Sequence, residues 1–393
     1  MIRWTKAWWL PLALGSVHCA RTECANPDYH DAECRLIAAH EMARLQRADG
    51  LELRFQDPNT RATDSWSSLG RWRIGSDGLS EGRVGPLGPF RISLHRNDAP
   101  VQRLRFRLTN VHPDVLLEGQ VARDGLTRVL EVDLSEEDDV VVIEGTLPRG
   151  TCGSGARVAA VGDVQTNPQA FATLLDAMHQ ELADADETGQ WFAGLLFLGD
   201  ASEDGTREEF DEIEQLLARA PVPTAMTPGN HDITHGTQPL YTQVFGDGNL
   251  SFDVCGTRLV LLDSGSAELA GSVVGDLSGF LGEGPVIFGT HYPLQPVHTT
   301  NGWTREDHAQ LLISELAQRD SPLVLAGHVH RRVAVDRALP HVIVGTGGAS
   351  QGAVEPDFGY LRLPLGRPSE RCFVPTPTIG GEPTARSALE DCP

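Results

Sequence analysis

From Arg157 onward, the sequence alternates short apolar strands with helical segments, which predicts an α/β fold. Helices are expected at Phe171–Ala183, Glu208–Arg219 and Asp307–Gln318. Polar residues suited to binding a ligand follow five of the strands. These five segments are Gly162-Asp163-Val164-Gln165, Gly199-Asp200, Gly229-Asn230-His231-Asp232, Gly289-Thr290-His291 and Gly327-His328-Val329-His330. Because open α/β sheets bind ligands beyond the carboxyl ends of their strands, we expect these segments to lie together.

Each of these segments has a simple structural explanation when it is taken alone. Asn230 and Asp232 bond readily to their own backbone in turns, and an isolated histidine is commonly a hydrogen-bonded structural residue. His328 and His330, however, are two residues apart on an extended segment, so their side chains point to the same side. Taken together, the segments favour a site for two metal ions over a set of unrelated structural roles.

The five segments resemble the motifs of the calcineurin-like metallophosphoesterases. The family pattern is Asp-x-His, Gly-Asp, Gly-Asn-His-Asp or Glu, Gly-x-His and Gly-His-x-His, and the resemblance covers about residues 156–349, roughly half of the chain. It implies a metallophosphoesterase fold, in which a two-sheet β-sandwich is flanked by helices, whereas the strand pattern alone gives only α/β. It also implies hydrolysis of phosphoric esters by a water molecule activated between two metal ions.

The resemblance further implies a role for each matching residue. Asp200 would bridge two metals, and the other ligands would be Asp163, Gln165 and His330 for the first metal and Asn230, His291 and His328 for the second. His231 would contact the phosphate or protonate the leaving group. Asp232 would orient His231 by accepting a hydrogen bond and would favour its charged form. This mixture of carboxylate, amide and imidazole ligands suits Mn, Fe or Zn rather than Ca.

Two positions depart from the family pattern. Gln165 stands where most members have histidine, and an amide oxygen is a weaker donor than imidazole, so the first metal is expected to bind more loosely than the second. Glu203 follows Asp200 by three residues, where the purple acid phosphatase branch has tyrosine. The chain is therefore not expected to be a purple, tyrosinate-ligated enzyme.

Between Leu51 and Glu144 the apolar pattern has a period of two, which predicts an antiparallel β-sandwich. One helix is expected before it, over Cys34–Asp49. Strands are expected around Phe106 and at Arg71–Ile74, Phe90–Leu94, Val115–Val121, Arg128–Leu134 and Val140–Ile143. Around Phe106 the apolar residues alternate with arginines. An arginine stripe can bind an anionic surface, but such alternation is more often the solvated face of a strand.

These patterns divide the chain into five regions. They are a secretion or lipoprotein-type signal at 1–19, a cysteine-containing linker with a short helix at 20–50, an accessory β-sandwich at 51–148, a catalytic domain at 149–352, and a closing strand with a C-terminal tail at 353–393. The closing strand is expected around Gly359–Leu363.

The first 19 residues have the parts of an export signal. Arg3 and Lys6 precede the apolar run Ala7–Gly15, which is too short to span a bilayer. Cys19 could accept a lipid, as in bacterial lipoproteins and with anchoring to a membrane, or the chain could be cleaved near Ala20. Both alternatives remain open, and both place the protein in the bacterial envelope or outside the cell.

Export favours disulfides among the seven cysteines. If Cys19 carries lipid, six cysteines remain. Cys24–Cys34 and Cys372–Cys392 are the nearest pairs in the sequence, which leaves Cys152 with Cys255, although the sequence alone does not determine the connectivity.

The net charge of −22 argues against nucleic-acid binding. It also opposes the binding of a phosphate ester unless the site supplies its own positive charge, for which a metal is the simplest source. We therefore expect an exported hydrolase of phosphoric mono- or diesters. The alternative is a cell-surface binding protein, in which a degenerate phosphoesterase scaffold acts through its β-sandwich. The sequence does not indicate which esters are cleaved, which metals are used or what the oligomeric state is.

Overall fold

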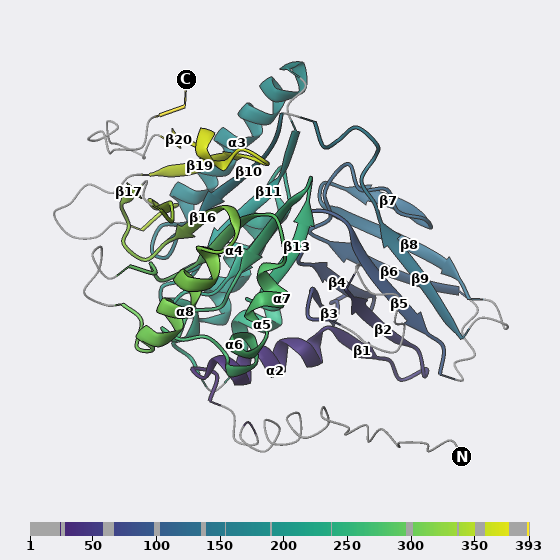
Figure 1. The fold of residues 1–393 in the computed structure, drawn as a ribbon. Helices are drawn as coiled ribbons and strands as arrows, with labels where there is room; N and C mark the ends of the chain where they lie inside the picture. The colour runs from purple at the N-terminus through teal and green to yellow at the C-terminus, as the bar shows by residue number, and fades with distance from the viewer. Residues whose placement is uncertain are drawn as a thin grey trace, which may run out of the picture.

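The computed structural model describes Cys24 and residues 28–57, 67–97, 103–134, 139–153, 155–188, 191–236, 238–295, 302–335, 338–349, 358–376 and 391–392. The expected signal at 1–19, including Cys19, lies outside the described residues. Two bodies lie side by side, an all-β sandwich formed from the first half of the chain and a larger α/β body formed from the second half (Figure 1).

The smaller body is a sandwich of two sheets. One sheet has the strand order β1 (Arg44–Gln46), β2 (Glu52–Gln56), β5 (Phe90–His95) and β9 (Val140–Gly145). The other has the order β3 (Gly70–Ile74), β4 (Ser80–Val84), β6 (Arg103–Thr109), β8 (Thr127–Asp133) and β7 (Gln120–Asp124). The alternate residues that face inward form one apolar core, which includes Phe55, Trp72, Ile92, Phe106 and Leu130. The period-two pattern in the sequence therefore marks the buried faces of these strands.

Three elements of this half differ from the sequence expectation. Helix α2 covers only Ala32–Met42, because the next residues form β1, which pairs with β2 and brings Leu45 against the sandwich core. The strand β7 starts only at Gln120, since the earlier residue Leu116 makes an isolated bridge to Thr146 instead. Strands β4 and β6 run parallel, because β5 lies between them in the sequence but belongs to the other sheet.

The arginine stripe on β6 is the solvated face of a strand. Arg103 is 62% exposed and pairs with Glu131 and Asp133 on the neighbouring strand. Arg107 pairs with Asp77 and with Glu81. Arg103 and Arg107 are thus matched by acidic neighbours, whereas Arg105, the arginine between them, is exposed and forms no ion pair among the described residues.

The larger body contains two further sheets packed face to face. The first has the order β12 (Thr224–Thr227), β11 (Trp191–Leu198), β10 (Ala156–Val161), β19 (Gly359–Pro364) and β20 (Cys372–Pro375). The second has the order β13 (Leu250–Val254), β14 (Thr257–Leu261), β15 (Pro285–Thr290), β16 (Asp320–Ala326), β18 (His341–Val344) and β17 (Arg332–Val335). Their facing side chains, such as Val158, Leu196, Leu261 and Ile287, share one core.

Helices cover the outer faces of both sheets (Figure 1). On the first sheet these are α3 (Pro168–Thr188), α4 (Arg207–Ala218) and α5 (Leu240–Phe245). On the second they are α6 (Gly271–Gly275), α7 (Leu277–Leu281) and α8 (Glu306–Leu316). The layers therefore run helix, sheet, sheet, helix. This two-sheet sandwich flanked by helices, preceded by a smaller all-β sandwich, confirms the fold class predicted from the sequence.

The two bodies are joined through the edge strand β12. The side chain of Asn110 accepts from the backbone N–H of Thr224 at 2.8 Å and donates to its carbonyl oxygen at 3.0 Å. The buried Arg83 donates to the carbonyl oxygens of Thr224 and Phe245. The buried Arg71 donates to the carbonyl oxygen of Val244 at 2.6 Å. The sandwich is thereby fixed to the strand that leads into the Gly229–Asp232 segment.

Three disulfides join the cysteine pairs expected from proximity, namely Cys24–Cys34, Cys152–Cys255 and Cys372–Cys392. The second of them ties the connection between the two bodies to the turn between β13 and β14. Among the described residues, no helix combines the length and the apolar composition needed to cross a membrane.

Candidate metal centre

Five strand ends bring the expected ligands together at one edge of the paired sheets. The strands β10, β11 and β12 of the first sheet lead into the segments of Asp163, Asp200 and Asn230. The strands β15 and β16 of the second sheet lead into His291 and into His328 and His330. Within each sheet these strands are parallel, so their carboxyl ends lie at the same edge. Side chains that are up to 167 positions apart in the sequence, from Asp163 to His330, meet there because the two sheets pack face to face.

The side chains form two groups that share one carboxylate. Asp163, Asp200 and His330 make the first group, and Asp200, His291 and His328 make the second, with the candidate ligand atoms of each group within 4.8 Å of one another. Asp163 is fully buried and Asp200 is 1% exposed. Two buried carboxylates in one cluster require a source of positive charge, which a pair of cations bridged by Asp200 would supply.

In the group around His291, several candidate ligand atoms lie close to one another. His291 Nε2 lies 3.0 Å from Asn230 Oδ1 and 3.3 Å from Asp200 Oδ2. His328 Nδ1 lies 3.1 Å from Asn230 Oδ1 and 3.2 Å from His291 Nε2. Burial would lower the pKa of His291, but Asp200 and Asp163 outweigh burial and raise that pKa to about 9. In this arrangement a proton on His291 offsets the carboxylate charge, and a cation would take its place.

The group around Asp163 contains buried polar atoms that lack a hydrogen-bond partner among the described residues. Asp163 Oδ1 accepts from the backbone N–H of His328 at 2.8 Å, but Asp163 Oδ2 and His330 Nδ1 have no such partner. Burial raises the pKa of Asp163 well above its usual range and lowers the pKa of His330 to about 4. Unsatisfied buried polar atoms destabilise a fold. A metal ion would satisfy them, so these residues fit the metal site that the sequence implies.

Gln165 also lies in the cluster, but with its amide nitrogen toward the shared carboxylate. Gln165 Nε2 donates to Asp200 Oδ2 at 2.8 Å, while the backbone N–H of His231 donates to Asp200 Oδ1 at 3.0 Å. A half-turn of the Gln165 amide would present its oxygen to the same space. Gln165 is therefore placed either to orient Asp200 or to contribute one neutral oxygen.

The backbone at these positions is held in a conformation that residues other than glycine rarely adopt. Asp163, Gln165, Asp200, His328 and His330 all have φ between 38° and 70°, in the left-handed region. Strained residues of this kind cluster at functional sites, where the surrounding structure enforces them.

Glycine is required beside two of these ligands. A Cβ atom at Gly229 would clash with the side chain of Asp200, and one at Gly327 would lie 3.0 Å from Asp163 Oδ2. The glycines in the sequence motifs therefore make room for the carboxylates.

The expectation that Asp232 orients His231 is wrong. The Asp232 carboxylate accepts from the backbone N–H groups of Ser202 and Gly229, each at 2.9 Å, and from the Ser202 hydroxyl. His231 and Asp232 begin the 3₁₀ turn η1 (His231–Ile233), in which successive side chains point about 120° apart. Burial, aided by Asp200, raises the pKa of Asp232 to about 6. Asp232 thus organises the backbone around the site, and the hydrogen bond of the His231 imidazole goes to Glu203 instead.

The partner of His231 is Glu203, which the sequence motifs do not assign to this role. His231 Nδ1 donates to the backbone carbonyl oxygen of Glu203 at 2.7 Å, and Glu203 Oε2 lies 3.8 Å from the same nitrogen. The loop that carries Glu203 is fixed by Glu209, whose carboxylate accepts from the backbone N–H groups of Glu203, Asp204 and Thr206. The sequence does hold a signal for this loop, because Thr206 and Glu209 form a capping box at the start of α4.

Comparisons with known proteins identify the same half of the chain. The family model described as Calcineurin-like phosphoesterase matches residues 156–332. A protein of Nostoc sp. named 3′,5′-cyclic-nucleotide phosphodiesterase is 25% identical over 164 residues. That match spans 38% of this chain and 60% of the relative, which is less than two thirds of the relative's length.

Two solved structures resemble the chain more distantly. GAP50, the anchor in the inner membrane complex of Plasmodium, is 16% identical with a TM-score of 0.42, over 61% of this chain and 89% of that chain. A dimetal phosphatase from Danio rerio is 15% identical with a TM-score of 0.41, over 54% of this chain and 93% of that chain. Because both TM-scores are low, the assignment rests on the family match together with the motifs and the fold described above. Residues 156–332 belong to the calcineurin-like phosphoesterase superfamily.

Proposed function

We propose that this protein is an exported, metal-dependent hydrolase of phosphoric esters that works with two metal ions. The observation that carries the proposal is that Asp200 belongs to both groups of candidate ligands, in which every residue except the half-buried His328 is buried. Asp163, His330 and, through its amide oxygen, Gln165 would complete the first site. Asn230, His291 and His328 would complete the second. The mixed oxygen and nitrogen donors suit Mn, Fe or Zn.

Metal ions bound at these sites would supply a nucleophilic water and positive charge for the phosphoryl oxygens. The chain's own residues prepare the site for that chemistry. Asp200 is held through both carboxylate oxygens, by Gln165 Nε2 and by the backbone N–H of His231, so its orientation is fixed before any ligand arrives. The net charge of −22 would repel a phosphate ester elsewhere on the surface, which confines productive binding to a site with its own cations.

His231 is the residue that we propose to exchange a proton with the leaving group. Because its Nδ1 donates to the carbonyl oxygen of Glu203, Nε2 is the atom at which the ring gains or loses a proton. The side chain is 32% exposed, whereas the ligands Asp163, Asp200 and His291 are buried, so His231 remains accessible to a bound ester. This placement supports a role as a general acid.

We propose phosphoric mono- and diesters as the substrate class. The Nostoc relative is named as a cyclic-nucleotide phosphodiesterase, so 3′,5′-cyclic nucleotides belong in the set of substrates to be tested. The fold and the ligand set serve for both monoesters and diesters, and a comparison of rates across the two classes decides between them.

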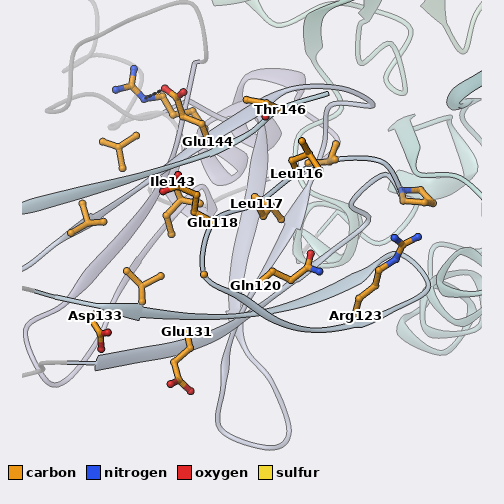
Figure 2. A pocket seen from close by; sticks show the side chains of 17 residues that line it. Leu116, Leu117, Glu118, Gln120, Arg123, Glu131, Asp133, Ile143, Glu144 and Thr146 are labelled. Carbon is orange, nitrogen blue, oxygen red and sulfur yellow. Dashed lines mark ion pairs between the residues drawn. The ribbon is translucent and has the colours of Figure 1, made fainter. Parts of the chain in front are cut away.

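A second candidate function is binding through the β-sandwich, on a scaffold without catalysis. One observation favours it: a groove of about 900 Å³ lies beside β7, β8 and β9 (Figure 2). Leu116, which lines the groove, is 58% exposed. The nearly complete set of metal ligands favours the enzyme, because a scaffold without catalysis has no use for two buried carboxylates in one cluster.

Export is proposed from the disulfides and from the signal-like start of the chain. Three disulfides fit an oxidising compartment. Mass spectrometry of protein recovered from the bacterial envelope or the medium checks this proposal. We expect three disulfides, and either an acyl mass on Cys19 or a new N-terminus near Ala20. Six free thiols in such material would contradict export.

Replacing the shared carboxylate tests the metal mechanism. Asp200→Asn keeps the shape of the side chain but removes its charge, so we expect hydrolysis of aryl phosphate mono- and diesters and cyclic nucleotides to fall by orders of magnitude while the circular dichroism spectrum is retained. Asp211→Asn is the matched control, because Asp211 is an exposed carboxylate that pairs with Arg207 on α4. Chelator-treated wild type that hydrolyses these esters at the original rate would contradict the mechanism.

Removal of the imidazole tests the proton-transfer role. General acid catalysis typically contributes about 10²–10⁴-fold, so we expect His231→Ala to lose about that factor on esters with poor leaving groups and far less on activated aryl esters. The measurement is kcat/KM for a series of esters whose leaving groups differ in pKa. If kcat/KM falls by the same factor for every ester in the series, His231 does not act as a general acid and contributes only to phosphate binding.

Because Gln165 stands where most family members have histidine, we predict that the two sites bind metal with different affinities. Since an amide is a weaker donor than imidazole, we expect wild type to keep less than two equivalents of metal after dialysis and to gain activity when Mn is added. Gln165→His should tighten the first site and reduce the dependence on added Mn. Bound metal and activity are followed together in one titration. Two tight equivalents in wild type, unchanged by the substitution, would show that Gln165 is already a competent ligand.

A further inference from the structure

A buried arginine from the segment before the β-sandwich reaches the larger α/β body at the sheet edge that carries the metal centre. Arg35 lies on helix α2, with 4% of its side chain exposed. Its Nε and Nη2 atoms donate to the Asp263 carboxylate at 2.6 and 2.8 Å. Nη1 donates to the carbonyl oxygens of Tyr29 and His30, and Nη2 donates also to the hydroxyl of Ser266. All five N–H groups of the guanidinium therefore have an acceptor.

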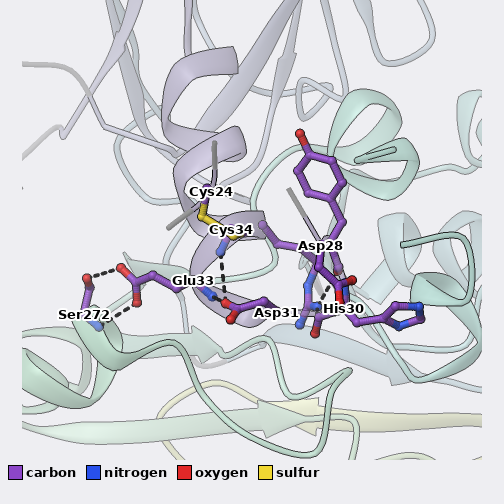
Figure 3. The surroundings of a disulfide bond; sticks show 9 residues. Cys24, Asp28, His30, Asp31, Glu33, Cys34 and Ser272 are labelled. Atoms are coloured by element: carbon purple, nitrogen blue, oxygen red, sulfur yellow. Dashed lines mark hydrogen bonds between the residues drawn. A yellow bond between two sulfur atoms is a disulfide. The ribbon is translucent and has the colours of Figure 1, made fainter. Parts of the chain in front are cut away.

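The arginine is presented by a short segment that is itself fastened at several points. We call residues 28–35 the N-terminal strap. The Cys24–Cys34 disulfide closes a loop that includes most of the strap, and Asp31 caps the helix that carries Arg35 (Figure 3). The Glu33 carboxylate accepts from the backbone N–H of Ser272 at 3.0 Å and from its hydroxyl. The strap is thereby held against the larger α/β body.

The acceptor of the Arg35 ion pair begins a loop that supports a metal-ligand segment. Asp263 follows β14, and the next residue is Ser264. The Ser264 hydroxyl oxygen accepts from the backbone N–H groups of His291 and Tyr292 at 3.1 and 3.3 Å. The position of the His291 backbone therefore depends on where the loop that starts at Asp263 lies.

The same loop also touches the turn that carries Asn230. Asp263 Oδ1 accepts from the backbone N–H of Gly265 at 2.9 Å. Gly265 in turn lies so close to Gly229 that a Cβ atom at Gly265 would be 2.9 Å from the Gly229 carbonyl oxygen. The Asp263 carboxylate thus fixes a loop that contacts the metal centre at two places. These are the backbone of His291 and the turn before Asn230.

The ion pair is what permits that carboxylate to be buried. Asp263 is 2% exposed, and a buried carboxylate without a cationic partner is strongly destabilised, so its loop would move toward water if the arginine were lost. We propose that Arg35 is a positioning residue for the metal centre: it keeps Asp263 buried and thereby holds the loop 263–265 against the segments of His291 and Asn230. This inference rests on the proposed function, because it assigns the loop a part in metal binding.

Two measurements on Arg35→Met test the coupling. In metal-free protein, hydrogen exchange at the His291 and Tyr292 amides should become faster, because their acceptor on Ser264 moves. In a calorimetric titration, the Kd for Mn²⁺ should rise by about 10-fold, the lower end of the effect of losing an outer-shell partner of a metal ligand. Arg35→Lys keeps the charge and should recover part of both effects. Arg103→Met is the matched control, since it removes an ion-paired arginine that is 62% exposed on the sandwich.

These measurements distinguish a role of Arg35 in positioning the metal centre from a role in attaching the strap alone. If folded Arg35→Met shows unchanged hydrogen exchange at the His291 amide, Arg35 does not position the loop, and the proposal is overturned. If exchange is faster but the Kd for Mn²⁺ is unchanged, Arg35 only attaches the strap to the larger body and has no part in metal binding. If Arg35→Met does not fold, Ser264→Ala leaves the ion pair intact and removes only the acceptor, and an unchanged Kd there overturns the proposal. Wild type that binds none of Mn²⁺, Fe²⁺ and Zn²⁺ would defeat the proposed function and, with it, the part of this inference that concerns metal binding. The exchange comparison would still decide whether Arg35 holds the loop.

Discussion

The interaction on which the site depends is the repulsion between two carboxylates enclosed in the same small volume. Asp163 and Asp200 are buried beside each other, and their pKa values move in opposite directions: burial raises that of Asp163, while His291 lowers that of Asp200 despite its burial. Such a pair persists only because the strands that carry it are fixed on both faces by apolar cores. Burying the two carboxylates destabilises the folded state, and the packing of the surrounding apolar cores offsets that cost.

Much of the site could be predicted because its signal is local. An apolar run that ends in glycine and a ligand-type side chain occupies a few consecutive residues, and the parallel order of the strands brings those residues to one edge. The backbone adds a feature that residue types alone do not reveal, since five of the predicted ligands adopt left-handed φ values. The glycines of the motifs are explained in the same way, by the small space around Asp163 and Asp200.

The features that the sequence did not predict depend on contacts between distant segments or on the geometry of a turn. Asp232 was expected to orient His231 because the two are adjacent, yet a 3₁₀ turn directs their side chains apart. Arg35 and Asp263 are 228 residues apart and carry no shared motif. The helix before the sandwich was drawn too long, because pairing with β2 outweighs a helical pattern of apolar residues. In each case tertiary contact decided between two conformations that the local sequence allows.

The place of β10 within its sheet has a consequence for how the protein is made. β10 lies between β11, which follows it closely in the chain, and β19, which begins about 200 residues later (Figure 1). Until synthesis has reached β19, one edge of β10 has no hydrogen-bonding neighbour, and an open strand edge invites pairing with other chains. A nascent or truncated polypeptide would thus carry a nearly complete ligand set on an unfinished sheet. β19 therefore closes an edge that would otherwise leave the centre of this sheet open to pairing with other chains.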